Sequence, residues 1–155
     1  MTDALQPGDR IPSLNPDVGV VARIDGLAAA SKDAPGDQAA MAELWRAVLS
    51  LERWICIARG ADDQPRPFVG GFPEGPMLLV FTTAERARAG AVAAGLPEEE
   101  ARRLLAVPLP GAIEWAASLA ASGVHGLVLD HGITGAYAPL ANLVPMRDWF
   151  AANPA

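Results

Sequence analysis

Three residues near the end of the chain have side chains that could do chemistry: His125, Asp130 and His131. Zinc accepts imidazole and carboxylate ligands, and a histidine titrates near neutral pH, where it can serve as a general base. The chain has no third histidine and no second cysteine to complete a usual zinc site. We therefore predict no metal and no cofactor. The three residues remain the site of an alternative function, a small-molecule-binding or metal-dependent hydrolase-like enzyme.

The same residues also have a structural explanation. His125 alternates with Leu127 and Leu129 along an expected strand, and this spacing predicts a packed, hydrogen-bonded histidine. The segment from Asp130 to Gly132 is typical of a tight turn after that strand.

Other nucleophiles are not supported by their surroundings. Cys56 lies between two isoleucines in the expected strand WICIARG, which predicts a buried thiol, whereas a nucleophilic cysteine needs exposure and a nearby base or positive charge. None of the serines stands in a G-x-S-x-G motif. We therefore predict that the protein is not an enzyme.

Tryptophans and one glycine-rich loop have features typical of a binding surface. The chain has four tryptophans, and tryptophan is enriched where one surface packs against another. Core packing is the competing explanation, because three of the four lie on inward-facing patterns. The loop from Phe68 to Pro73 carries aromatic residues on a flexible backbone, although a hairpin connection explains its glycines as well. The predicted interaction surface comprises Phe68, Gly70, Gly71, Phe72, Trp45 and Trp149.

Length and charge restrict the class of partner. The 155 residues suffice for one domain with its own core, and the net charge of −6 disfavours nucleic acid and anionic membrane surfaces. No apolar run reaches the roughly 20 residues of a membrane span, and the N-terminus does not resemble an export signal. We expect a cytoplasmic protein that binds a protein partner or forms a homo-oligomer.

The stretch from Met77 to Gly95 organises the expected fold. Its first five residues are continuously apolar, which predicts a strand covered on both faces. Thr82 and Glu85 fit a capping box, so a helix is expected to begin there, with small residues facing the sheet. A strand that leads into a helix can bind anions, but this turn lacks the glycines that such a site needs.

The remaining pattern predicts an α/β fold, a mixed and mostly buried sheet of about five strands with helices on its faces. Residues 1–36 are rich in proline and glycine, which predicts a partly ordered, irregular arm. Within it, the apolar segment from Val18 to Ile24 is expected either to add a short strand or to lie across the domain surface. Residues 37–152 form the predicted domain. Its clearest further elements are a helix from Asp37, a hairpin after Val124 and a C-terminal helix near Pro145.

Several segments follow one another in a recognisable order, LWRAVLSLERWICIARG, PFVGGFPEGPMLLVFTTAERARA, VPLPGAIEWAASL, GVHGLVLDHG and AYAPLANL. In this order they resemble the SseB N-terminal domain family of bacterial cytoplasmic proteins (enhanced serine sensitivity protein B), over about residues 38 to 145. The resemblance implies a small α/β domain without an established catalytic activity, associated in some members with secretion-system genes. It supplies no catalytic residues, and the C-terminal domain of longer members has no counterpart here. The function we predict is a non-catalytic interaction or accessory module.

Overall fold

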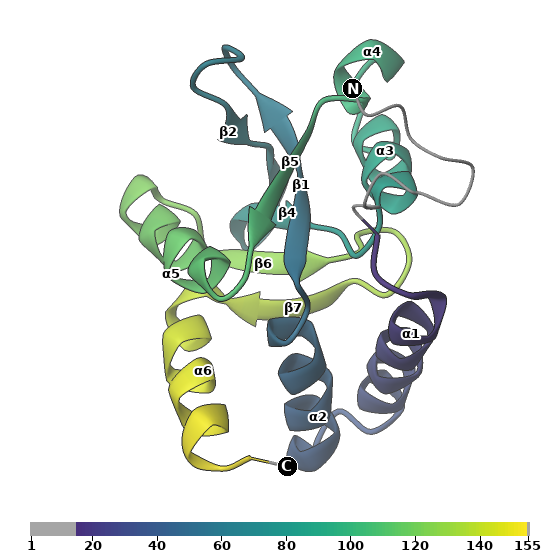
Figure 1. Cartoon of the computed structure of the whole chain (residues 1–155), viewed down its shortest axis with the longest axis vertical. Helices are drawn as coiled ribbons and strands as arrows, with labels where there is room; N and C mark the ends of the chain where they lie inside the picture. Colours follow the sequence, from purple (N-terminus) through teal and green to yellow (C-terminus); the bar gives the residue numbers. More distant parts are fainter. Residues whose placement is uncertain (1–14, 155) are drawn as a thin grey trace, which may run out of the picture.

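The structure, a computed structural model, describes residues 15–154 and has a mixed α/β fold, as predicted (Figure 1). Its helices are α1 (Val18–Asp33), α2 (Gln38–Leu49), α3 (Ala84–Ala93), α4 (Glu98–Ala101), α5 (Gly111–Ser118) and α6 (Leu143–Ala152), with short 3-10 helices η1 (Leu119–Ser122) and η2 (Leu140–Asn142). Its strands are β1 (Arg53–Arg59), β2 (Arg66–Pro67), β3 (Val69–Phe72), β4 (Gly75–Val80), β5 (Leu104–Pro108), β6 (Gly126–Leu129) and β7 (Ala136–Pro139).

These strands form two sheets rather than one sheet of about five strands. The first has the order β2-β1-β5 and is antiparallel, and the second has the order β3-β4-β6-β7, in which β4 and β6 are parallel. The two sheets meet at a bridge in which the amides of Ile55 and Phe81 donate to each other's carbonyls at 3.1 and 2.8 Å. The chain passes from the first sheet to the second at Phe68, whose amide donates to the carbonyl of Ile57. Two strands that are only one residue apart in the chain, β2 and β3, therefore belong to different sheets.

The central strands are buried on both faces, as their continuous apolar sequences predict. Along β1, Trp54 and Cys56 enter the larger of two apolar clusters, whereas Ile55 and Ile57 enter the smaller one. The larger cluster lies against α1, α2, α5 and α6, and the smaller one contains the inward alanines of α3 and α4. In Figure 1, α1, α2 and α6 accordingly lie at one end of the molecule and α3 and α4 at the other.

The expectation of an irregular arm with a short strand is wrong for residues 18–33, which form the 16-residue helix α1. Glycines at 19 and 26 lower the helix propensity by about 1 kcal/mol each. Packing against the core outweighs that cost, because Ile24, Ala28 and Ser31 lie on one helical face and are buried. Residues 1–14 of the predicted arm lie outside the described residues.

The later elements follow the prediction closely. The hairpin expected after Val124 is the antiparallel pair β6 and β7. The C-terminal helix is α6, which begins at Leu143, two residues before the expected proline. Helix α3 ends before Gly95, whose φ of 100° is the left-handed conformation expected of a closing glycine.

Candidate functional site

The three residues whose side chains could do chemistry, His125, Asp130 and His131, do not form one site. His125 precedes strand β6, whereas Asp130 and His131 follow it. The four residues of β6 lie between His125 and Asp130, so the two positions are five residue steps apart, or about 16 Å at roughly 3.3 Å per residue. Within residues 15–154, no group of three or more histidine, cysteine, aspartate or glutamate side chains is placed to hold a metal ion.

The prediction of a packed histidine at position 125 is wrong. His125 is exposed, and its ring stacks beside that of Tyr137 with a centroid separation of 6.1 Å. The strand begins only at Gly126, so the alternation along β6 does not include His125. The ring of Tyr137 lies over Gly126, where a Cβ atom would collide with it.

Asp130 is fully buried and acts as a structural hub. Its carboxylate accepts hydrogen bonds from the amide of Thr82 at 2.9 Å, from the hydroxyl of Thr82 at 2.8 Å and from Arg86 at 2.8 Å. Its backbone has a φ of 47°, and its carbonyl accepts from the amides of Ile133, Thr134 and Gly135. A turn is present here, as predicted, but the carboxylate is held by protein donors and is not presented to a substrate.

Arg86 joins this hub to the N-terminal helix. Its guanidinium donates two hydrogen bonds to Asp25 of α1, at 2.9 and 2.8 Å, in addition to the one it donates to Asp130. The hydrogen bond from Arg86 holds the pKa of Asp25 below its ordinary value, and the hydrogen bond to Asp25, with smaller contributions from Asp130, raises the pKa of Arg86. We call Asp25, Thr82, Arg86 and Asp130 the polar clamp, because they connect α1, α3 and the end of β6.

The predicted capping box of α3 is wrong by one residue. The cap is Thr83, whose hydroxyl accepts from the amide of Arg86 at 3.1 Å, while Thr82 is bound to Asp130. Asn15 accepts from the amide of Ala84 and donates to Glu85. The sequence favours Thr82 because a glutamate follows three residues later, but Thr82 is bound instead by Asp130, which is 48 residues away. The amides of Ala84 and Arg86 in the first turn of α3 are thus engaged within the protein.

Cys56 is buried, as predicted. Burial raises the pKa of its thiol to about 12, so the thiolate that a nucleophile requires does not form near neutral pH.

The predicted interaction residues fall into two separate places. Phe68 and Phe72 are half-buried against the smaller apolar cluster, and the ring of Phe72 lies edge-on to His131 at 5.2 Å. The hairpin of β3 and β4, with Phe68 just before it, therefore packs partly against the smaller apolar cluster. Gly70 and Gly71 lie in strand β3 of the same hairpin. The other two residues, Trp45 and Trp149, both line one groove between α2 and α6.

The α2–α6 groove is an open, apolar hollow of about 720 Å³. Its lining residues are Gln38, Ala39, Met41, Ala42, Trp45, Asn142, Pro145, Met146, Trp149 and Phe150. Trp45 is 1% exposed and belongs to the larger core cluster, whereas Met41 and Trp149 are 39% and 53% exposed. The groove is thus a continuation of the core that no described residue covers. The sequence predicted both helices, but it gave no indication that this part of their apolar faces stays open.

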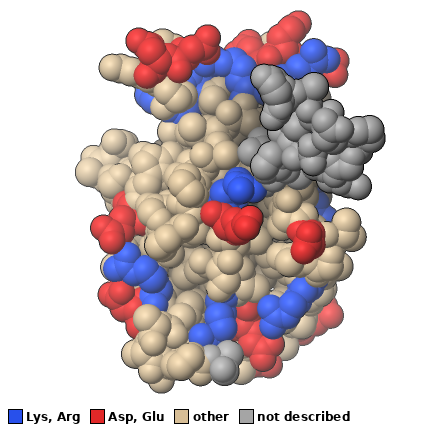
Figure 2. All heavy atoms as spheres, in the orientation of Figure 1, with Lys and Arg blue, Asp and Glu red and all other residues tan. Residues whose placement is uncertain are grey.

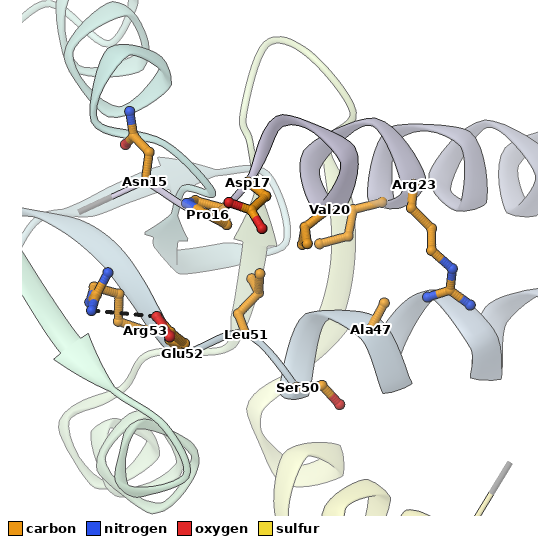
Figure 3. A pocket seen from close by; sticks show the side chains of 11 residues that line it. Asn15, Pro16, Asp17, Val20, Arg23, Ala47, Ser50, Leu51, Glu52 and Arg53 are labelled. Carbon is orange, nitrogen blue, oxygen red and sulfur yellow. Dashed lines mark ion pairs between the residues drawn. The ribbon is translucent and has the colours of Figure 1, made fainter. Parts of the chain in front are cut away.

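A second hollow, of about 340 Å³, lies between the start of α1 and the start of β1 (Figure 3). Its polar lining includes Asp17, Arg23 and the weak ion pair of Glu52 with Arg53, at 3.7 Å. The Glu52 side chain is 83% exposed, which is typical of a solvated surface. Among the described residues, every buried side-chain nitrogen or oxygen already has a partner, so no buried polar group is left for a ligand in this hollow.

The surface charges are mixed rather than segregated. Figure 2 shows basic and acidic side chains intermixed on the face drawn, without a continuous basic surface among the described residues there. None of the helices in residues 15–154 is long and apolar enough to cross a membrane.

Together these features describe a mixed α/β fold with an internally satisfied polar clamp and an open apolar groove. The chain matches no protein-family model, no curated protein and no solved structure. The similarity to the SseB N-terminal domain family therefore stays a prediction based on the sequence motifs.

Proposed function

We propose that the protein is a non-catalytic interaction or accessory module and that the α2–α6 groove is its binding surface. The observation that carries the proposal is the exposure of Met41 and Trp149 beside the buried Trp45. Apolar side chains that continue a core and remain open to solvent are typical of protein-binding surfaces. Tryptophan is also among the residues that contribute most to binding energy when a partner buries them.

The polar groups of the molecule support a non-catalytic function. The carboxylate of Asp130 accepts three hydrogen bonds within the clamp, Cys56 is buried, and the two histidines lie at opposite ends of β6. The alternative enzyme based on His125, Asp130 and His131 would need these groups to converge on one substrate. Their separation counts against that alternative.

The location and pathway are proposed from the sequence. The resemblance to the SseB N-terminal domain family supports a role in a bacterial cytoplasm, associated with a secretion system. A protein partner in such a system, or a second copy of the chain, would supply the apolar surface that covers the groove.

Site-specific photocrosslinking in cells of the source organism tests the binding surface. A photoreactive phenylalanine analogue replaces Trp149, and a matched variant carries it at Val92, which is 47% exposed on α3. We expect a discrete adduct from position 149 and none from position 92. The substitution Met41→Asp, made in the position-149 variant, should abolish the adduct because it places a charge in the groove. The absence of any adduct from position 149 would contradict the proposed surface.

A further inference from the structure

The two walls of the α2–α6 groove share one spacing among their lining residues. Helix α2 contributes residues 38, 39, 41, 42 and 45, and the α6 wall contributes residues 142, 145, 146, 149 and 150. Four residues of each wall, 38, 41, 42 and 45 on one side and 142, 145, 146 and 149 on the other, follow the pattern i, i+3, i+4, i+7, which is one face of a helix over about two turns, or roughly 10 Å. Two helices side by side with apolar faces of this kind provide the groove into which a third helix packs.

The lining also restricts the backbone of the occupant. The groove is walled by helix side chains, and its lining has few hydrogen-bonding groups, namely the amides of Gln38 and Asn142 and the indole N–H groups of the two tryptophans. No sheet edge lies in this lining, so an extended peptide would bury backbone amides and carbonyls without partners, at a cost for each unpaired group. A helix satisfies its own backbone and presents only side chains. The groove therefore favours a helical occupant.

The charges next to the groove determine which charge the flanks of the bound helix should carry. The lining itself has no charged residue, so the inserted face must be uncharged. Asp37 directly precedes the α2 wall, and Asp148 directly precedes Trp149. Arg147 is paired with both Glu114 and Asp148, which leaves that cluster with one net negative charge.

Arg46, the arginine of α2, does not reverse this balance. Arg46 donates to the carbonyl of Asn153 at 2.9 Å and lies over the ring of Phe150, and it lines a different hollow. The chain as a whole has a net charge of −6. Basic residues beside the apolar face of a partner would therefore be attracted to this end of the molecule.

We infer that the α2–α6 groove binds an amphipathic α-helix of a partner protein, with an uncharged apolar face about two turns long and basic residues on its flanks. The inference rests on the proposed function, because it specifies the partner of the same surface. A second copy of this chain fits less well, since a two-fold contact through the groove would bring its acidic flanks together.

Three synthetic peptides without tryptophan test the inference on the full chain. Two share one leucine-rich helical face and differ only in lysine or glutamate at the flanking positions, and the third is the lysine peptide interrupted by two prolines. Binding is followed by NMR, through the indole N–H of Trp149 and the methyl group of Met41. We expect the lysine peptide to bind at least about tenfold more tightly than the glutamate peptide at low salt, and this difference should shrink as salt screens the flanks. The proline-interrupted peptide should not bind, because two prolines break the helix.

Variants of the groove supply the controls. Trp149→Ala should weaken binding of the lysine peptide at least about tenfold, the effect expected for loss of an aromatic anchor. Met41→Ala should weaken it less, and Val92→Ala on α3 should leave it unchanged. Equal binding of all three peptides, or resonance shifts confined to residues outside the groove, would overturn the inference.

Combining the peptides with the crosslinking experiment distinguishes the two proposals. An adduct from position 149 together with no binding of the lysine peptide overturns the helical partner and leaves the interaction surface intact. An adduct of twice the 16.1 kDa mass of the chain identifies a second copy as the occupant and also overturns the helical partner. The absence of both adduct and peptide binding overturns both proposals.

Discussion

The side chains of the polar clamp have partners within the protein, whereas several side chains of the α2–α6 groove are exposed to solvent. In the clamp, the fully buried carboxylate of Asp130 accepts hydrogen bonds from Thr82 and Arg86. Arg86 also donates to the carboxylate of Asp25. In the groove, Trp149 and Met41 are apolar and open to solvent. The charged groups that would attract attention in a search for an active site thus hold the fold together, while the surface that remains open has no charge. A residue type that could do chemistry is therefore not always accessible to a ligand in the folded protein.

One of the two largest effects is expected from removing Asp130, the centre of the clamp. Asp130→Ala leaves Arg86 and Thr82 without their buried partner and removes a side chain that tolerates a positive φ. We expect a loss of about 3 to 5 kcal/mol in the free energy of unfolding, measured by urea denaturation.

Asp130→Asn is the matched control. It retains an acceptor oxygen and the tolerance of the left-handed conformation, so its loss should be smaller than that of the alanine variant. An alanine variant within about 0.5 kcal/mol of the wild type would show that the clamp is not a stabilising structure, because surface changes typically stay within that limit.

A second prediction concerns how closely α3, the helix that carries Arg86, approaches the sheet. A Cβ atom on Gly90 would lie 2.5 Å from two carbons of the buried Phe81 ring, so Gly90→Ala should destabilise the protein by about 1 to 3 kcal/mol despite the better helix propensity of alanine. Gly26→Ala on α1 is the control, because nothing lies within 4 Å of its Cβ position. There the same change should add about 0.5 to 1 kcal/mol. Equal effects at both positions would contradict close packing of α3.

A third, smaller effect is expected from the part of the clamp that reaches α1. The pKa of Asp25 is lowered by its hydrogen bond to Arg86, so its contribution to stability is complete above the ordinary pKa of 3.8 and is lost as the pH falls through the lower folded value. Asp25→Asn removes this contribution, which we expect to be under about 1 kcal/mol because the side chain is 35% exposed.

Unfolding experiments at neutral pH and below the ordinary pKa of Asp25 measure this effect. The difference between the wild type and Asp25→Asn should decrease as the medium becomes more acidic. Asp63→Asn, in the exposed turn before β2, serves as the control and should change stability little at any pH. A difference that grows on acidification would contradict the ion pair.

The sequence predicted most of the helices and strands, but not the features that depend on contacts between distant parts of the chain. The continuous apolar runs in β1 and β4 identified strands buried on both faces, since that pattern depends only on neighbouring residues. Helix α1 was missed because Gly19 and Gly26 weaken the local signal, and it is the packing of Ile24 against distant elements that stabilises the helix. The cap of α3 was placed one residue early for a related reason, because Asp130 binds the first of two threonines.

The candidate site was predictable only in part. Trp45 and Trp149 were among the predicted interaction residues, but their meeting in one groove depends on how α2 and α6 pair, and no local pattern contains that information. The sequence also placed His125, Asp130 and His131 close together in the chain. An extended strand then separates them, because each residue of a strand adds about 3.3 Å.

The smallest effect on stability is expected at Trp149, and it tests directly whether the groove differs from the core. Trp149→Ala should change the free energy of unfolding by no more than about 0.5 kcal/mol, because more than half of the side chain is exposed at 53% and surface changes have effects of this size. Trp45→Ala, on the opposite wall but 1% exposed, should cost about 3 to 5 kcal/mol. Urea denaturation of both variants makes the comparison directly. If Trp149 contributes as much to stability as Trp45, the groove is part of the core and its exposure has no functional meaning. If Trp149 contributes little to stability and much to peptide binding, then it serves the partner rather than the fold.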